Sequence, residues 1–278
     1  MEAPDTTAPA RDTPRRAALE ALLRARSSWL VAFSGGVDSS ALLVAAVRAL
    51  GASRVLAVTA DSPSYPESDR RDARECAEAL RVEHLFVNTN EVENPLYAAN
   101  EPNRCYFCKT ELFDVLEPLR LARGLDAIAY GEIIDDAADF RPGARAARER
   151  GVAAPLRDAG FTKNDARELL LAEGFERLAR KPASACLSSR IPYGTRVEPA
   201  VLARIGACEE WLRSRGYRIV RVRHHDSIAR LELDEAGIAR SLDPAERAAI
   251  TTFFKSQGYK YVAIDLGGYR MGSMNPVS

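Results

Sequence analysis

The segment Ser34-Gly35-Gly36-Val37-Asp38-Ser39 constrains the fold of this 278-residue chain more than any other. It follows the apolar run at residues 29–33, which predicts a buried strand. It precedes residues 41–50, which are apolar on nearly every side and predict a buried helix. Paired glycines let the backbone curl and bring its N–H groups close to an anion, and the positive end of the following helix points at the same place. The segment therefore predicts a phosphate-binding turn between a strand and a helix.

Strand-like and helix-like segments alternate through the first 130 residues. Apolar runs predict strands at 29–33, 55–59, 84–87 and 127–130. Helical patterns occupy residues 14–28, 41–50, 68–80 and 112–122. Such alternation is typical of an α/β fold with a doubly wound parallel sheet.

The pattern changes near residue 190, where we expect a domain boundary. Residues 181–199 contain Pro182, Pro192, Gly194 and Pro199 and predict an extended loop. Helices at 200–215 and 244–258, with strands at 217–224, 228–233 and 261–266, predict a small α+β unit. The expected organisation is a flexible tail at 1–13, an α/β domain at 14–190 and a C-terminal domain at 191–278.

Asp38 is unexpected inside a turn that binds an anion, because its carboxylate would repel a bare phosphate. It makes sense if Mg²⁺ lies between the carboxylate and the phosphate. Ser34 and Ser39 would add hydroxyl donors. The alternative is a plain glycine turn between strand and helix, which supplies no reason for the carboxylate. Asp135 and Asp136 follow the fourth predicted strand and are either part of the site or the acidic start of a helix.

Composition limits the classes of protein that need to be considered. The chain has 39 basic and 39 acidic residues, so it is not a generally basic nucleic-acid binder. No segment approaches the roughly 20 apolar residues that span a bilayer, and the start has no apolar signal region, so we expect a soluble cytoplasmic protein with no membrane partner. Lysine occurs only at positions 109, 163, 181, 255 and 260, which we attribute to genome base bias.

The five cysteines do not form a disulfide framework, since they are few for the length and odd in number. Cys76 and Cys208 fall on predicted helices and are expected to be buried thiols. Cys105 and Cys108 form a C-x-x-C, whose possible uses are a redox dithiol, half of a zinc site or part of an iron–sulfur site. With Cys186, in a loop poor in core residues, they make three candidate ligands. Three thiolates suit a [4Fe–4S] cluster with one iron left open, and the alternative is three unrelated thiols.

The glycine turn resembles the SGGxDS loop of the PP-loop ATP pyrophosphatases, which have an adenine nucleotide alpha hydrolase-like fold. It is neither a Gly-Lys-Ser/Thr P-loop nor a GxGxxG turn. The resemblance implies that residues 34–39 hold the phosphates of ATP and that Asp38 binds Mg²⁺. It also implies that adenine lies near Thr59 and Gly131. Glu132 and Ile133 depart from the Thr and Asn that usually follow this glycine.

Several longer segments resemble the LarE family of sulfur-inserting enzymes. They lie at residues 34–39, 104–112, 139–143, 181–195 and 268–273. The resemblance implies an ATP-dependent sulfurtransferase that adenylylates a carboxylate of pyridinium-3,5-biscarboxylic acid mononucleotide and replaces an oxygen with sulfur. The product would mature into the nickel-pincer nucleotide cofactor of lactate racemase. It also implies a homo-oligomer, by family a hexamer.

The resemblance gives Cys186 the central role. In members with a single cysteine, the residue at this position gives up its own sulfur; members with three cysteines resemble carriers of a [4Fe–4S] cluster that delivers exogenous sulfide from a donor. Cys105 and Cys108 favour the cluster type for this chain. Candidates for binding the substrate phosphate and second carboxylate are Arg190, Arg196, Arg221 and Arg223, because arginine binds such groups bidentately. Glu209 and Glu210 are expected on a helix surface.

Three alternatives remain at this point. A tRNA thiouridine synthetase-like enzyme of the same superfamily would need a basic RNA surface, against which the zero net charge counts. A synthetase that uses ammonia leaves the three cysteines without a role. A non-catalytic nucleotide-binding or cluster-carrier protein leaves Asp38 without one.

Overall fold

The structure is a computed structural model that describes residues 13–135, 142–182 and 185–270. Residues 1–12 of the predicted tail at 1–13, Asp136, most of the 139–143 segment and the end of the 268–273 segment lie outside these residues. The chain forms two compact units that interleave along the sequence. The first comprises Met1–Asp61, Asp69–Thr89 and Cys105–Ser184, and the second comprises Ser62–Ser68, Asn90–Arg104 and Ala185–Ser278. The boundary expected near residue 190 stays a prediction.

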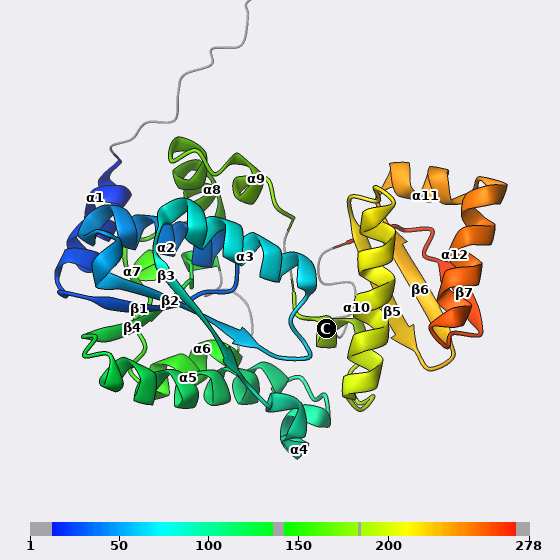
Figure 1. The fold of residues 1–278 in the computed structure, drawn as a ribbon, viewed down its shortest axis with the longest axis horizontal. Helices are drawn as coiled ribbons and strands as arrows, with labels where there is room; N and C mark the ends of the chain where they lie inside the picture. The colour runs from blue at the N-terminus through cyan, green and yellow to red at the C-terminus, as the bar shows by residue number, and fades with distance from the viewer. Residues whose placement is uncertain (1–12, 136–141, 183–184, 271–278) are drawn as a thin grey trace, which may run out of the picture. The chain divides into compact units, whose positions relative to one another are not determined.

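A four-stranded parallel sheet forms the centre of the first unit (Figure 1). Its strands are β1 (Trp29–Ala32), β2 (Val55–Asp61), β3 (Glu83–Asn88) and β4 (Ala127–Tyr130), in the order β3-β2-β1-β4. Trp29 pairs with Val55 on one side and with Ala127 on the other, so β1 is central. This arrangement confirms the predicted doubly wound α/β fold.

Helices cover both faces of this sheet, as the alternating burial of β1 requires. Trp29 and Val31 pack under α1 (Pro14–Arg24), α2 (Val37–Leu50), α3 (Glu67–Leu80) and α8 (Lys163–Ala172). Leu30 and Ala32 pack against α5 (Arg104–Ala122) and α6 (Pro142–Glu149) on the opposite face. Short connecting elements complete the unit: η1 (Ala52–Arg54), α7 (Pro155–Asp158) and α9 (Glu176–Ala179).

Helix ends account for most differences from the sequence-based prediction. The first helix ends at Arg24, and α5 begins at Arg104, eight residues before the predicted start at 112. The polar stretch at 135–160 contains α6 and α7. The first turn of α5 lacks an apolar stripe, so periodicity alone could not find it. In contrast, Thr162 caps α8 in a reciprocal capping box with Asp165, as the sequence predicted.

The second unit contains a small mixed sheet of β5 (Val220–His225), β6 (Ile228–Leu233) and β7 (Tyr261–Ile264). β5 and β6 are antiparallel, whereas β6 and β7 are parallel. Helices α10 (Pro199–Ser214), α11 (Glu235–Ser241) and α12 (Pro244–Ser256) accompany the sheet, with the short elements η2 (Glu91–Glu93), α4 (Pro95–Ala98) and η4 (Leu187–Arg190). Trp211 of α10 stacks on Phe253 of α12, with ring centroids 4.6 Å apart. The predicted α+β character is confirmed, although the sequence analysis missed α11.

Within the described ranges, none of the helices has both the length and the apolar character needed to cross a membrane.

Candidate active site

The turn between β1 and α2 has the geometry of an anion cradle. Gly35 has a φ of +63°, and a Cβ there would lie 2.7 Å from the carbonyl oxygen of Asp69, so only glycine fits. Gly36 is the N-cap of α2 and, as a glycine, has no side chain with which to cap the helix. The first N–H groups of a helix have no partner inside it, and the helix dipole makes this end positive. The hydroxyls of Ser34 and Ser39 lie 3.1 Å apart beside them. The cradle can therefore receive the phosphates of a nucleotide.

Residues of the two neighbouring strands, β2 and β4, or directly after them, contact the backbone of this turn or of Phe33 just before it. Gly131 directly follows β4, and a Cβ there would lie 2.6 Å from the backbone nitrogen of Ser39. Thr59 of β2 is buried and donates its hydroxyl hydrogen to the carbonyl oxygen of Phe33 at 2.6 Å. The Thr59 oxygen also lies 2.8 Å from Nε2 of His84, whose pKa burial lowers to about 4. The structure thus brings Thr59 and Gly131 together with residues 34–39, while their role in binding adenine stays a prediction.

Asp38 already has a cationic partner. Nζ of Lys163, at the start of α8, lies 2.9 Å from Oδ1 and 2.7 Å from Oδ2 of Asp38. The backbone N–H of Lys163 donates to Asp135 at 2.7 Å. A cation therefore lies at the carboxylate that was predicted to face Mg²⁺, and it is supplied by the chain itself.

A second lysine holds the other side of the cradle. Nζ of Lys181 donates to the carbonyl oxygen of Gly35 at 2.9 Å and pairs with Asp69 and Asp72 of α3 at 2.8 and 2.5 Å. The sequence analysis missed both lysines because they follow the loop by more than 120 residues. A signal was available: the chain has five lysines, and two of them contact this loop.

The C-x-x-C lies in the first turn of α5, in the first unit. Cys105 is exposed and Cys108 half-buried. The start of α6 packs closely here, because a Cβ at Gly143 would lie 3.4 Å from the carbonyl oxygen of Cys105. A C-x-x-C at a helix start is also the arrangement of redox dithiols, so the position of the motif does not distinguish that use from a ligand role.

The other cysteines differ in their surroundings. Cys76 and Cys208 are buried, and burial raises the pKa of each to about 12, which confirms their predicted character as ordinary buried thiols. Cys186 is half-buried and directly precedes η4 in the second unit. Among the residues that the structure describes, no group of three or more His, Cys, Asp or Glu side chains is arranged to hold a metal ion.

The predicted substrate-binding arginines all lie in the second unit but differ in exposure. Arg196 is exposed, whereas Arg190, Arg221 and Arg223 are buried, at 0%, 8% and 5% exposure. Burial and the charge of Arg190 lower the pKa of Arg221, which indicates that the two guanidinium groups lie close together. Whether these arginines bind substrate stays a prediction.

Glu209 was expected on a helix surface, and this expectation is wrong. Its side chain is fully buried between Arg190, at 2.9 Å, and Arg213, at 2.7 Å. It also accepts the backbone N–H of Val222 at 3.0 Å. Burial alone would raise its pKa, but the two arginines hold the pKa at about 2. Charged side chains on helices are usually exposed, and the sequence does not show that Arg190 and Arg213 enclose this one.

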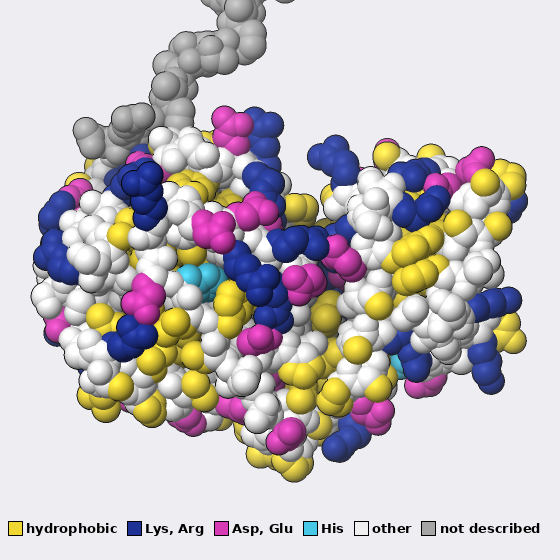
Figure 2. Space-filling view, viewed as in Figure 1, with side chains coloured by type: hydrophobic (Ala, Val, Ile, Leu, Met, Phe, Trp, Pro, Cys, Tyr) yellow, Lys and Arg dark blue, Asp and Glu magenta, His cyan; other side chains and the backbone are white. Residues whose placement is uncertain are grey.

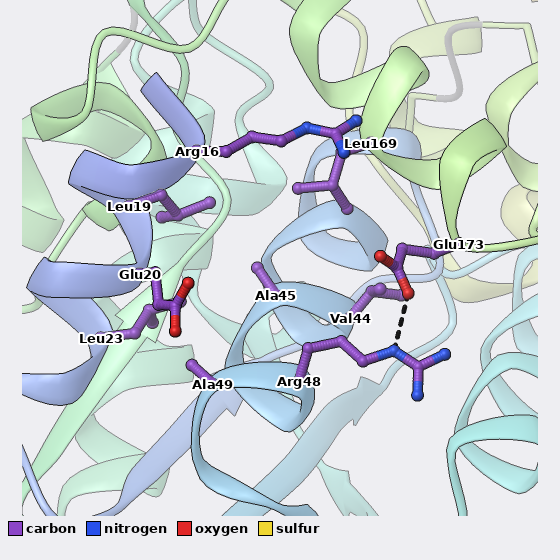
Figure 3. A pocket seen from close by; sticks show the side chains of 10 residues that line it. All are labelled: Arg16, Leu19, Glu20, Leu23, Val44, Ala45, Arg48, Ala49, Leu169 and Glu173. Carbon is purple, nitrogen blue, oxygen red and sulfur yellow. Dashed lines mark hydrogen bonds and ion pairs between the residues drawn. The ribbon is translucent and has the colours of Figure 1, made fainter. Parts of the chain in front are cut away.

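A hollow of about 150 Å³ lies elsewhere in the first unit, between α1, α2 and α8 (Figure 3). Its residues on α2 run from Val44 to Ala49, so they begin about 8 Å along the helix from Ser39. Arg48 and Glu173 at its rim pair with each other at 2.7 Å. The hollow is therefore separate from the phosphate cradle.

Known proteins are similar to this chain over most of its length. An uncharacterized Synechocystis protein is 42% identical over 248 residues, which cover 89% of this chain and 92% of its own. The pyridinium-3,5-bisthiocarboxylic acid mononucleotide synthase of Lactiplantibacillus plantarum is 36% identical over 261 residues, or 94% of each chain. The chain belongs to the LarE family. It is accordingly an ATP-dependent sulfurtransferase built on the PP-loop fold.

Two further similarities cover only part of the chain. The asparagine synthase family model matches residues 16–102. An NH(3)-dependent NAD(+) synthetase of Methanococcoides burtonii is 38% identical over 63 residues, which cover 23% of this chain and 24% of the synthetase. These partial matches concern ATP use rather than the substrate.

Proposed function

We propose that this protein inserts sulfur into pyridinium-3,5-biscarboxylic acid mononucleotide during synthesis of the nickel-pincer nucleotide cofactor of lactate racemase. The name of the Lactiplantibacillus relative, which matches over 94% of each chain, supports this substrate. The observation that carries the proposal within the molecule is the cradle at residues 34–39, with two lysines beside it.

The cradle would bind the triphosphate of ATP through backbone N–H groups and the hydroxyls of Ser34 and Ser39. Lys163 and Lys181 would then neutralise part of the phosphate charge, as ammonium groups do at other phosphate sites. Thr59 and Gly131 would lie beside the adenosine part of the nucleotide.

Asp38 would hold Mg²⁺ when ATP is bound. Mg²⁺ keeps several waters and is held by one or two carboxylates together with substrate phosphates, so a single aspartate beside the cradle suits it. Bound there, the ion would screen the charge of the phosphates.

The reaction has two steps, and its atoms balance with ATP and sulfide as co-reactants. A carboxylate oxygen of the substrate attacks the α-phosphorus of ATP, and pyrophosphate leaves. Sulfide then attacks the acyl carbon of this adenylate, and AMP leaves with the original oxygen, which gives a thiocarboxylate. The first step is needed because a carboxylate oxygen is a poor leaving group, whereas AMP is a good one.

Cys105, Cys108 and Cys186 would hold a [4Fe–4S] cluster, which would supply sulfide from an external donor. The thiols are suited to this because two are on one helical turn and none of the three is buried.

The arginines of the second unit would attract the substrate's phosphate and second carboxylate. Arg196 is exposed and can contact an anion directly. Arg221 and Arg223 alternate on β5 and place two further charges on one face of the small sheet. Arg190 is fully buried and pairs with Glu209, so it would act on the substrate's anionic groups only indirectly.

The proposal is tested by anaerobic purification with iron and sulfide analysis, followed by reaction with ATP, Mg²⁺, sulfide and the pyridinium dicarboxylate mononucleotide. Mass spectrometry should detect repeated formation of the thiocarboxylate, with AMP and pyrophosphate, and Cys186→Ala should abolish it. An iron-free protein that reacts once and gains dehydroalanine at position 186 would exclude the cluster.

Efficient thiolation of tRNA, without reaction of the mononucleotide, would instead support the tRNA thiouridine synthetase alternative. On the face shown in Figure 2, basic and acidic side chains are interspersed, in keeping with the zero net charge. Light scattering would measure the molar mass in solution and thereby test the proposed homo-oligomer.

A further inference from the structure

The backbone around Cys186 is held by arginine side chains from three segments of the second unit. Arg190 donates to the carbonyl oxygens of Ala185, at 2.6 Å, and Cys186, at 3.0 Å. Arg104 donates to the carbonyl oxygen of Ser188 at 3.0 Å, and Arg223 donates to that of Ser189 at 2.9 Å. Four carbonyl oxygens within five residues thus accept guanidinium hydrogens. We call Arg104, Arg190 and Arg223 the arginine cradle.

Each member of the arginine cradle is itself buried and held by an acceptor on another element. Arg190 pairs with Glu209 of α10, and Arg223 pairs with Glu232 of β6 at 2.6 Å. Arg104 donates to the side-chain oxygen of Asn100. The arginines are 0% to 5% exposed, so the contacts persist without competition from water.

Arg190 is the member that contacts Cys186 itself. Its Nε and Nη2 form a fork to the two oxygens of Glu209, at 2.9 and 3.1 Å. Its Nη1 is left to bind the carbonyl oxygens of residues 185 and 186 and the hydroxyl of Ser189. This division of donors requires a planar guanidinium, because an ammonium group cannot present a fork and a second set of donors at once.

We propose that Arg190, oriented by Glu209, is a positioning residue that fixes the backbone of Cys186 and thereby the direction of its sulfur. The proposal rests on the sulfur-transfer function proposed above. Backbone dihedral angles set the direction of the Cα–Cβ bond and limit which staggered rotamers are open to Sγ. The two clamped carbonyl groups, of residues 185 and 186, flank the Cα of Cys186 and so restrict where Sγ can lie. Displacement of a reacting group by about 1 Å can reduce the rate of reaction about 100-fold.

The test compares Arg190→Lys with Arg213→Lys in the full chain. Both substitutions remove an arginine contact to Glu209 and keep the charge, but only Arg190 contacts residues 185 and 186. The first measurement is hydrogen–deuterium exchange of the segment 185–191. Arg190→Lys should accelerate exchange there about tenfold and leave α2 unchanged, whereas Arg213→Lys should leave the segment as slow as in the wild type.

The second measurement is steady-state sulfur transfer. For Arg190→Lys, kcat should fall about 10- to 100-fold while KM for the mononucleotide stays the same, because binding is retained and the sulfur is misplaced. Arg213→Lys should transfer sulfur at the wild-type rate. Equal losses in both variants, or faster exchange without loss of kcat, would overturn the positioning role.

Two further outcomes separate this proposal from its premises. If the wild type transfers no sulfur at all, the proposed function fails, while the exchange comparison still decides whether Arg190 clamps the segment. If Arg190→Lys does not fold, hydrogen exchange in the wild type provides the test. The N–H groups of Ser189 and Ile191 donate to the carbonyl oxygens of Cys186 and Ser188. These two N–H groups must exchange as slowly as those in the buried turns of α10. Fast exchange there would contradict the clamp.

Discussion

At the scale of single residues, Lys163 connects two parts of the sequence that share no local pattern. Its ammonium group contacts both oxygens of Asp38, and the two side chains are about one-third and one-fifth exposed. Under the proposed function, this carboxylate would repel a bare triphosphate and attract a metal ion. The lysine would resolve this conflict in the protein without nucleotide, because it pairs with Asp38 until a metal–nucleotide complex could replace it.

Replacement of Lys163 by Met should therefore weaken ATP binding more in EDTA than in Mg²⁺. Without the metal, the unpaired Asp38 carboxylate would repel the triphosphate, and we expect a loss of about tenfold in affinity or more. With Mg²⁺ present, the ion replaces the lost ammonium and restores part of the affinity. Calorimetric titration with ATP measures both conditions, and Lys255→Met, at an exposed position on α12, is the matched control. Equal losses with and without Mg²⁺ would contradict this role.

Glu209 should make the stability of the protein depend on acid pH. Its pKa is about 2 in the folded state against an ordinary value of 4.5, because Arg190 and Arg213 outweigh the effect of burial. A carboxyl group with a depressed pKa stabilises the folded state fully above its unfolded pKa, and this contribution is lost as pH falls from about 4.5 to about 2. Denaturant unfolding between pH 7 and pH 3 should show a smaller pH slope for Glu209→Gln than for the wild type. Glu235→Gln, exposed on α11, should keep the wild-type slope.

The two residues also show what the sequence could reveal about the site. The turn at 34–39 was predictable because its glycines, serines and aspartate are contiguous and follow an apolar run. The contact of Lys163 was not, because its partner Asp38 lies 125 residues away. The burial of Glu209 was not either, because its partner Arg190 lies 19 residues away, and its i,i+4 pair with Arg213 is equally typical of an exposed helix. Charged residues are assigned to solvent by default, and only the folded backbone shows which are buried in pairs.

At the scale of elements, the sequence predicted all four strands of the parallel sheet and its principal helices. Most of these segments are buried on both faces or on one stripe, so apolar periodicity carries the information, and β3, which is only partly buried, still contains the apolar run Leu85–Val87. The prediction was wrong where local capping and packing determine whether a helix forms and where it begins. The helix α5 begins eight residues earlier than expected, and α11 was not predicted. Asp234 caps α11 by accepting the N–H of Gly237, a local signal that the apolar pattern does not contain.

Contact between the end of β4 and the start of α2 predicts the effect of a single methyl group. Gly131→Ala would place Cβ 2.6 Å from the backbone nitrogen of Ser39, so the first turn of α2 must move. We expect ATP affinity to fall about tenfold, since the displaced N–H groups are those that would face the phosphates under the proposed function. Gly124→Ala is the control: its φ is +60° and nothing lies within 4 Å, so it should cost about 1 kcal/mol of stability and leave ATP binding unchanged. Unaltered ATP affinity in Gly131→Ala would show that the contact does not shape the cradle.

At the scale of the whole molecule, the chain does not divide at one point. Residues Ser62–Ser68 and Asn90–Arg104 belong to the second unit although they lie between strands of the first. Asn100 shows how one of these inserted stretches depends on the C-terminal part of the second unit. It is fully buried, and its side-chain amide donates to the carbonyl oxygens of residues 191, 192 and 195. Val197 in turn donates its backbone N–H to Ala98. The second unit is therefore assembled from three separate stretches of chain.

A fragment comprising residues 14–190 should consequently not fold as the intact protein does. It keeps Asn100 but loses the three carbonyl groups that satisfy its amide, and each buried polar group without a partner costs about 1–3 kcal/mol. It also loses Val197, whose backbone N–H donates to the carbonyl oxygen of Ala98. We expect limited proteolysis to cut the fragment within residues 90–104, where the full chain resists cleavage, and thermal unfolding to begin at a lower temperature. A fragment that resists proteolysis in this segment and unfolds with the cooperativity of the full chain would instead support a boundary near residue 190.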